Sequence, residues 1–183
     1  TTTTSMTTHI FMAAGADPTV MIGGTLPMLH SGYRVGRGDT IILESCEYRN
    51  SFLYFFPTVA VVLNVEADHL DFFKDLDDIK ASFRRFAQLV PAGGHIVANA
   101  DDPGAMDALK GLPLFTFGCG EGADCRAENL VWHYGRPEFD VVVRGELYTH
   151  LSLRVAGKHN LSNALAAASA AYVLGIPSRA ARL

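Results

Sequence analysis

Acidic residues and a histidine directly follow two short apolar runs, and these side chains are the best suited to chemistry in the sequence. The first run, Thr58 to Leu63, is rich in Val and Leu, and the second is Thr40 to Leu43. The first leads into Glu66, Asp68, His69 and Asp71, and the second into Glu44 and Glu47. Mg²⁺ prefers oxygen ligands and takes one or two carboxylates beside substrate phosphates. Glu44 and His69 are therefore candidate Mg²⁺ ligands.

The two apolar runs must position these side chains. A short Val- and Leu-rich run without alternation is typical of a strand buried on both faces of a parallel sheet. Ligands in such sheets bind beyond the carboxyl ends of the strands, so we expect both groups of acids at one edge. The alternative is structural, with Asp68, Asp71 and Asp75 capping the following helices and His69 serving as a hydrogen-bonding partner.

The chain begins on a run of threonines that opens a predicted helix. A P-loop ends in Gly-Lys-Ser/Thr, and the hydroxyl after the lysine binds Mg²⁺ at the start of a helix. Thr1 is a candidate for that hydroxyl, with the glycine and lysine lying before the first residue. The alternative is an ordinary Thr-rich capping segment.

A third candidate is the segment Gly157 to Asn163, in which Asn160 and Asn163 are three residues apart on the first turn of a predicted helix. An asparagine amide can pair bidentately with the N6/N7 edge of adenine. The alternative is that Asn160 is simply the N-cap of this helix.

The order of predicted elements defines the fold class. Strands at 40–43, 58–63, 95–98 and 114–117 alternate with helices after Asp75 and Asp102, which predicts an α/β fold with a doubly wound, mostly parallel sheet flanked by helices. Three later strands, 130–134, 139–144 and 148–155, predict a small antiparallel β-meander packed beside that sheet. We expect Thr25 to Asp39 to be mostly loop.

Composition limits the possible functions. With 183 residues, 49% hydrophobic and 19% charged, the chain is long enough for one globular domain with a real core. A net charge of −4 does not favour a nucleic-acid or anionic-membrane partner. Three cysteines without C-x-x-C spacing favour neither zinc nor disulfides, and Cys46 has no recognisable base beside it as a nucleophile.

Taken together, four motifs resemble the Mur ligase superfamily. They are T-T-T-T-S-M at the start, L-E-S-C-E-Y-R-N-S-F at 43–52, P-T-V-A-V-V-L-N-V-E-A-D-H-L-D at 57–71 and G-K-H-N-L-S-N-A-L-A-A at 157–167. The second and third are most similar to the branch that adds L-alanine. The resemblance covers essentially the whole chain and implies a P-loop-type fold, with residues 1–183 as one central ATP-binding domain. Both ends look cut from a longer protein, and the family's N-terminal UDP-binding domain and C-terminal domain would lie outside this chain.

The resemblance also implies an activity. The family activates a substrate carboxylate with ATP as an acyl phosphate, which an amine then displaces. Here this would be ligation of L-alanine to UDP-N-acetylmuramate in cytoplasmic peptidoglycan precursor synthesis, with ATP and Mg²⁺ as cofactors and without nucleic-acid binding or membrane insertion. The isolated chain would be inactive. Alternatives are a murein-peptide ligase or another superfamily amide ligase, and a non-catalytic ATP-binding module with a degraded P-loop.

Site residues follow from the same resemblance. Thr1, Glu44 and His69 would bind Mg²⁺, with Glu44 and His69 as the catalytic pair. The ATP-binding residues would be Thr1, Thr2, His159, Asn160 and Asn163, and weaker candidates for substrate contact are Gly24, Thr25, Glu47 and Asn50. Several relatives carry a carbamylated lysine where this chain has Arg84, so we do not expect that modification. Cys46 and Arg49 replace acids of the related branch and are not assigned to the site.

Overall fold

The computed structural model describes residues 1–181, so the last two residues of the predicted domain 1–183 lie outside the described part of the chain. The helices are α1 (Thr2–Ala13), α2 (Leu76–Gln88), α3 (Pro103–Ala108) and α4 (Lys158–Val173), with 3₁₀ segments η1 (Pro27–Leu29), η2 (Tyr48–Tyr54) and η3 (Ser178–Ala180). The strands are β1 (Thr19–Leu26), β2 (Ser31–Arg34), β3 (Ile41–Leu43), β4 (Val59–Val62), β5 (His95–Asn99), β6 (Leu114–Gly118), β7 (Cys125–His133), β8 (Arg136–Val143) and β9 (Glu146–Ser152).

Six strands form the main sheet in the order β4-β5-β6-β7-β8-β9. The pairs from β4 to β7 are parallel, whereas β8 and β9 are antiparallel to their neighbours. The prediction that the meander packs beside the parallel sheet is wrong. It continues that sheet, because Phe117 and Gly118 of β6 pair with Cys125 and Arg126 at the start of β7.

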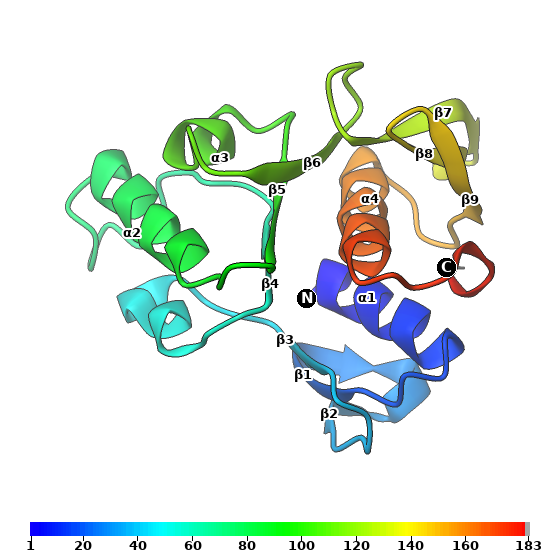
Figure 1. The fold of residues 1–183 in the computed structure, drawn as a ribbon, viewed down its shortest axis with the longest axis horizontal. Helices are drawn as coiled ribbons and strands as arrows, with labels where there is room; N and C mark the ends of the chain where they lie inside the picture. Colours follow the sequence, from blue (N-terminus) through cyan, green and yellow to red (C-terminus); the bar gives the residue numbers. More distant parts are fainter. Residues whose placement is uncertain (182–183) are drawn as a thin grey trace.

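Helices cover both faces of the main sheet, as the doubly wound prediction requires (Figure 1). On one face α2 and α3 pack against Val62, Ile96 and Ala98. On the other face α1 and α4 enclose the larger core, which includes Val97, Phe117 and Phe139. In α4 ten residues are buried, many of them alanines, because this helix lies between the sheet and α1. Such small side chains allow close packing on several sides at once.

A second sheet, with the strand order β2-β1-β3, lies on the far side of α1 (Figure 1). Two predictions are therefore wrong. Residues 25–39 contain a strand rather than mostly loop, and β3 and β4 belong to different sheets. Glycine explains the first error, because a Cβ on Gly32 would lie 2.7 Å from the carbonyl oxygen of Gly24, so a residue that suggests a loop allows β1 and β2 to approach. Nor is β3 buried on both faces, since Ile41 is 65% exposed.

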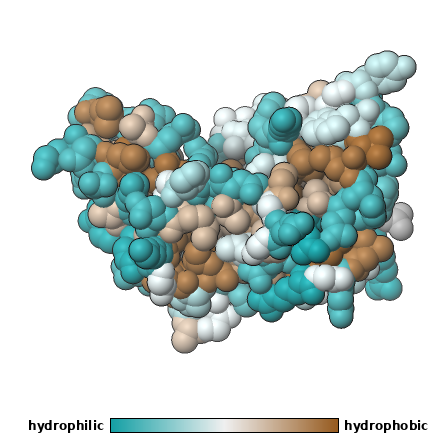
Figure 2. Space-filling view, turned by 90° about the horizontal axis from the view of Figure 1, so that it is seen from above, coloured by the Kyte–Doolittle hydropathy of each residue, from teal (hydrophilic) through white to brown (hydrophobic). Residues whose placement is uncertain are grey.

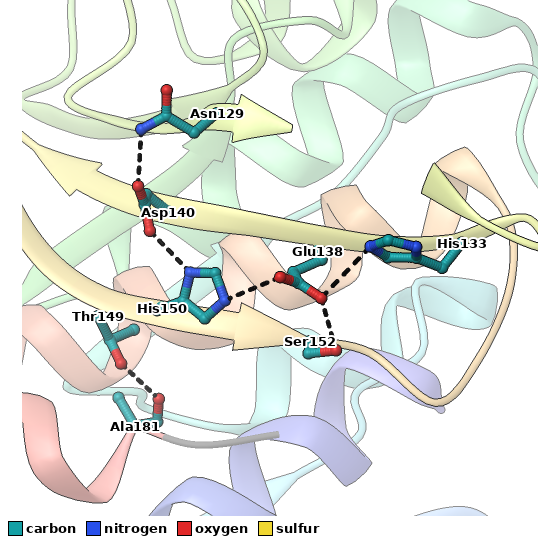
Figure 3. A network of polar contacts seen from close by, with 8 residues as sticks. All are labelled: Asn129, His133, Glu138, Asp140, Thr149, His150, Ser152 and Ala181. Atoms are coloured by element: carbon teal, nitrogen blue, oxygen red, sulfur yellow. Dashed lines mark hydrogen bonds and ion pairs between the residues drawn. The ribbon is translucent and has the colours of Figure 1, made fainter. Parts of the chain in front are cut away.

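The outer face of the meander carries a chain of polar contacts across β7, β8 and β9 (Figure 3). His150 Nδ1 lies 2.8 Å from Asp140 and His150 Nε2 lies 3.5 Å from Glu138, whose other oxygen is 3.5 Å from His133 Nε2. The hydrogen bond to Asp140 is the main cause that raises the pKa of His150. This exposed network joins neighbouring strands in a part of the sheet that has no helix crossovers.

The surface viewed from above is mixed in character, with hydrophobic residues in separate patches among hydrophilic ones (Figure 2). Within residues 1–181, none of the helices combines the length and the apolar character that crossing a bilayer demands.

Candidate functional site

The start of α1 and the end of β3 form the first part of the site. Thr1 occupies the N-cap position of α1, but its hydroxyl donates to Glu44 Oε1, 2.6 Å away, rather than accepting from the helix. The backbone N–H of Gly23 in β1 donates to the other oxygen, Oε2, at 2.8 Å. The parallel register that pairs Met21 with Leu43 makes this meeting possible. Thr1 and Glu44, both predicted Mg²⁺ ligands, therefore touch, and Thr1 holds the N-cap position of α1 without a side-chain capping hydrogen bond.

Glu44 is held as a carboxylate. Partial burial acts against the charged form, but hydrogen bonds from the Thr1 hydroxyl and the Gly23 N–H help to lower the pKa of Glu44. Gly23 itself was not predicted. A Cβ there would lie 2.9 Å from Glu44 Oε1, so only glycine leaves the carboxylate this position.

The second part of the site is a group made of Glu47, Asp68 and His69. His69 Nε2 lies 3.4 Å from Glu47 Oε1, and Nδ1 lies 3.9 Å from Asp68 Oδ1. Among residues 1–181, these are the three side chains whose possible metal-binding atoms all lie within 4.8 Å of one another. Glu44 is not among them, so the three predicted Mg²⁺ ligands are divided: Thr1 and Glu44 lie together, and His69 lies with Glu47, which was predicted as a substrate contact.

The backbone conformation of the loop after β4 determines the position of His69. Its backbone has a φ of 53°, in the left-handed region, and its carbonyl accepts from the N–H groups of Phe72 and Phe73. The N–H of His69 donates to Asp68 Oδ1 at 2.7 Å, so Asp68 supports the histidine rather than capping a helix. Only Asp75, the N-cap of α2, follows the structural alternative considered for the three aspartates.

A cavity of about 190 Å³ opens beside this group. Its polar side is formed by Glu47, Asp68, Glu66 and Asn64, and its apolar side by residues of β4 and α2 such as Ile79 and Phe83. Acids therefore line one wall of a small concave space at the carboxyl end of β4, where ligands of parallel sheets bind.

The first turn of α4 lies next to the first turn of α1. The hydroxyl of Thr3 donates to Asn163 Oδ1 at 2.8 Å, Asn163 Nδ2 donates to Asn160 Oδ1 at 3.2 Å, and Asn160 Nδ2 donates to the carbonyl of Ala156 at 2.7 Å. Gly157 is the N-cap, so the alternative that Asn160 has this role is wrong. One amide N–H and one oxygen lone pair of Asn160 remain, on a side chain that is buried.

The remaining predicted residues have varied surroundings. His159 is exposed, with its ring over Gly157, and Thr2 is the exposed first residue of α1. A Cβ on Gly24 would lie 3.3 Å from the Thr1 methyl group, so Gly24 adjoins the first part of the site, whereas Thr25 is exposed farther along β1. Asn50 accepts a hydrogen bond from Ser82 of α2. Arg84 donates to the carbonyls of Ala108 and Lys110 at the end of α3.

Two residues near this group, Asp68 and Tyr48, were not predicted from the sequence as part of the site. Asp68 was not among the candidate metal ligands, yet it completes the three-residue group; its position directly before His69 was the available signal. Tyr48 was not assigned, but its ring centroid lies 4.7 Å from that of His69. Nothing in the sequence reveals that contact, because it joins two loops that meet only in the folded chain.

An α/β sheet covered by helices on both faces, with acids and a cavity beyond the carboxyl end of β4, defines the class of domain that binds ligands at this edge of its sheet. Comparison with known proteins identifies the family, since the model of the Mur ligase middle domain matches residues 1–171. The chain belongs to the Mur ligase middle-domain family.

Curated relatives extend this likeness. The chain is 45% identical over 179 residues to a UDP-N-acetylmuramate–L-alanine ligase of Clostridium novyi, covering 97% of this chain and 39% of the relative. It is 44% identical over 185 residues to the enzyme of the same name from Caldanaerobacter subterraneus subsp. tengcongensis, covering 100% and 40%. The chain thus spans about two fifths of the length of these relatives.

Solved structures agree on the fold. A UDP-N-acetylmuramate:L-alanyl-γ-D-glutamyl-meso-diaminopimelate ligase from Neisseria meningitides superposes with a TM-score of 0.85 at 29% identity, over 99% of this chain and 60% of that one. A UDP-N-acetylmuramate-alanine ligase from Thermotoga maritima gives 0.80 at 27% identity, over 96% and 39%.

Proposed function

We propose that the protein to which this domain belongs is an ATP-dependent ligase that joins L-alanine to the carboxylate of UDP-N-acetylmuramate in peptidoglycan precursor synthesis. The names of the relatives at 44–45% identity support the substrates. The observation that carries the chemistry is the Thr1–Glu44 hydrogen bond at the N-terminus of α1. Use of ATP agrees with a cytoplasmic location.

The start of α1 suits the phosphates of ATP. The first N–H groups of a helix are free to bind anions, and the helix dipole favours negative charge there. Thr1 and Thr2 lie at this end, so we assign both to the phosphates. Glu44 is a carboxylate with a lowered pKa beside the Thr1 hydroxyl, and these two oxygen atoms are ligands of the kind that Mg²⁺ prefers.

The Glu47, Asp68 and His69 group fits a second divalent cation near the substrate carboxylate. Two carboxylates and an imidazole nitrogen within 4.8 Å of one another form a possible ligand set for a divalent cation. The carboxylate oxygens suit Mg²⁺, with water completing the shell, and the imidazole nitrogen is a softer third ligand. His69 must be neutral to serve as a ligand. When bound, the cations supply positive charge that lets one anion approach another.

The proposed reaction has two steps, formation of an acyl phosphate and its displacement by the amine. A carboxylate oxygen of the muramoyl group attacks the γ-phosphorus of ATP, the bond to the β-phosphate oxygen breaks, and ADP leaves. The amine of L-alanine next attacks the acyl carbon, inorganic phosphate departs and the amine loses a proton. The domain's part is to orient the phosphates and the carboxylate in line.

We assign adenine binding to the first turn of α4. His159 is exposed there and can contact the base, while Asn160 offers its remaining N–H and lone pair. Asn163 bonds to both Asn160 and Thr3, so it couples this turn to the phosphate-binding end of α1. Gly24, Thr25, Glu47 and Asn50 remain proposed substrate contacts, and among these Asn50 would have to share its hydrogen bond with Ser82.

A second substrate class has specific support. The similarity to the Neisseria ligase, at a TM-score of 0.85, favours a peptide amine such as L-alanyl-γ-D-glutamyl-meso-diaminopimelate as the alternative acceptor. The nucleotide chemistry would be the same in both cases.

Phosphate release by the full-length ligase tests the proposal. With UDP-N-acetylmuramate and ATP, we expect release that depends on L-alanine and exceeds that with glycine, L-serine or the tripeptide. Glu44→Gln and His69→Ala should each lower kcat at least about 100-fold, as loss of a metal ligand or its support can. Glu146→Gln, at the exposed start of β9, and His95→Ala, at the amino end of β5, are the matched controls. Full activity of both site variants would refute the metal assignment, and preference for the tripeptide would select the alternative acceptor.

A further inference from the structure

Tyr48 connects the two loops that carry the proposed second cation site. It is the first residue of η2 and directly follows Glu47, while His69 lies in the loop after β4. The two rings have centroids 4.7 Å apart and are tilted by 38°. Tyr48 therefore packs against the imidazole whose Nε2 faces Glu47 at 3.4 Å.

The tyrosine is fixed at its other end. Its hydroxyl donates to Asp71 Oδ2 at 2.9 Å, two residues beyond His69. The ring centroid of Phe72 lies 6.1 Å from that of Tyr48 in an edge-to-face arrangement, and the guanidinium carbon of Arg49 lies 5.5 Å from the Tyr48 centroid. These contacts hold the ring in one orientation, so that it presents a defined surface to the histidine.

The backbone of His69 does not by itself orient its ring. Its left-handed φ and the hydrogen bonds that its carbonyl accepts from Phe72 and Phe73 fix only the position of the backbone and of Cβ. Rotation about the side-chain bonds is then limited by Tyr48 on the ring face and by Glu47 and Asp68 at the nitrogens. A metal-binding histidine needs such supporting contacts to direct its nitrogen.

We propose that Tyr48 is the positioning residue for His69, holding the imidazole in the orientation that binds a divalent cation together with Glu47 and Asp68. This inference rests on the proposed function, because it concerns the same cation site.

A purely structural role would predict something different. The apolar anchor of η2 is Phe52, which is 2% exposed and stacks on Phe86 of α2 at 4.7 Å. Tyr48 lies outside that cluster, in contact with His69, Asp71 and the exposed Phe72. Its replacement should therefore weaken cation binding more than it lowers the stability of the domain.

Mn²⁺ binding provides a test that is independent of catalysis. Free Mn²⁺ is titrated by electron paramagnetic resonance against the full-length ligase and its variants, with His69→Ala defining the binding that depends on His69. We expect Tyr48→Leu to weaken this binding about tenfold, the lower end for loss of a contact that orients a metal-binding histidine. Tyr48→Phe and Asp71→Ala should each weaken it about threefold, and their double variant no more than either, because both remove the same hydrogen bond. Tyr54→Leu, the exposed tyrosine at the end of η2, should leave it unchanged.

The outcomes separate the two claims. Unchanged Mn²⁺ affinity in Tyr48→Leu, with normal His69-dependent binding in the wild type, overturns the positioning role alone. Absence of His69-dependent binding in the wild type overturns both the cation site and the positioning role. Weakened Mn²⁺ binding in a protein without ligase activity supports the positioning role and refutes the proposed reaction. If Tyr48→Leu fails to fold, the Tyr48→Phe and Asp71→Ala comparison still decides.

Discussion

Single side chains in this domain join segments that are distant in the sequence, and Asp124 shows how. Its Oδ2 accepts from the N–H and the hydroxyl of Thr116, at 2.8 and 3.0 Å, and its Oδ1 accepts from Arg144 Nε at 3.0 Å. Desolvation acts against the carboxylate, but these hydrogen bonds outweigh it and lower the pKa of Asp124. One residue thus ties β6 to the start of β7 and to the end of β8.

Replacing Asp124 with asparagine should make stability less dependent on pH in the acid range. A carboxyl with a lowered folded-state pKa stabilises the fold above its unfolded pKa of about 3.9, and this contribution disappears as pH falls through the folded value. We expect Asp124→Asn to cost about 1–2 kcal/mol at pH 7 and progressively less below pH 4. Urea unfolding from pH 7 down to pH 2.5 measures this, and a constant difference across that range would contradict it.

At the scale of elements, the caps of α2 and α3 are alike but have different consequences. Asp75 accepts from the N–H of Asp78, and Asp102 accepts from that of Ala105 at 2.7 Å. Asp102 also accepts from the N–H of Val65 at 3.0 Å, in the loop that leads to His69. Gly104 lets this loop approach, because a Cβ there would lie 1.9 Å from the carbonyl oxygen of Val65. The α3 cap therefore also holds the site loop.

Asp102→Ala should consequently destabilise the domain more than Asp75→Ala, its matched control. Loss of an N-cap costs about 1 kcal/mol, and loss of a second hydrogen bond to a carboxylate about 1.5–3 kcal/mol more. Denaturant unfolding of both variants gives the comparison. Hydrogen exchange should also show faster exchange at residues 64–69 in Asp102→Ala only, and equal losses in both variants would refute the shared role.

At the scale of the whole molecule, the meander and the parallel part of the sheet share one core. Phe139 of β8, fully buried, belongs to the same cluster as Val97 of β5 and Leu165 of α4. The single tryptophan, Trp132, lies in β7, while the helices lie in the layers around the sheet. Tryptophan fluorescence and helical circular dichroism thus report on different parts of one packed unit.

Both signals should change at the same denaturant concentration, because a shared core unfolds cooperatively. Phe139→Ala should move both midpoints together, at a cost of about 3–5 kcal/mol for a buried phenylalanine. Tyr134→Ala, at a fully exposed residue of the same meander, is the control and should move neither. Separate midpoints would show that the meander is an independent unit.

Local pattern predicted the elements whose signals lie within a few residues. The helices expected after Asp75 and Asp102 were confirmed as α2 and α3, each with that aspartate as its N-cap. The strand β2 was missed, because glycines that allow close strand approach have the same local signature as a loop. Whether β7 joins the parallel sheet or packs beside it depends on its pairing with β6, and the local sequence pattern does not predict that pairing.

The sequence by itself determined the α/β class, the acids at the strand ends, and, through its family motifs, which side chains to examine. Only the tertiary structure decided how they group: Glu44 with Thr1, His69 with Glu47 and Asp68, and Tyr48 against His69. The physical reason is that periodicity and capping act between near neighbours in the chain. Side chains 20 to 160 residues apart meet only through strand register and helix packing. Helix packing places the first turn of α4 against that of α1, and strand pairing places β3 and β4 in separate sheets.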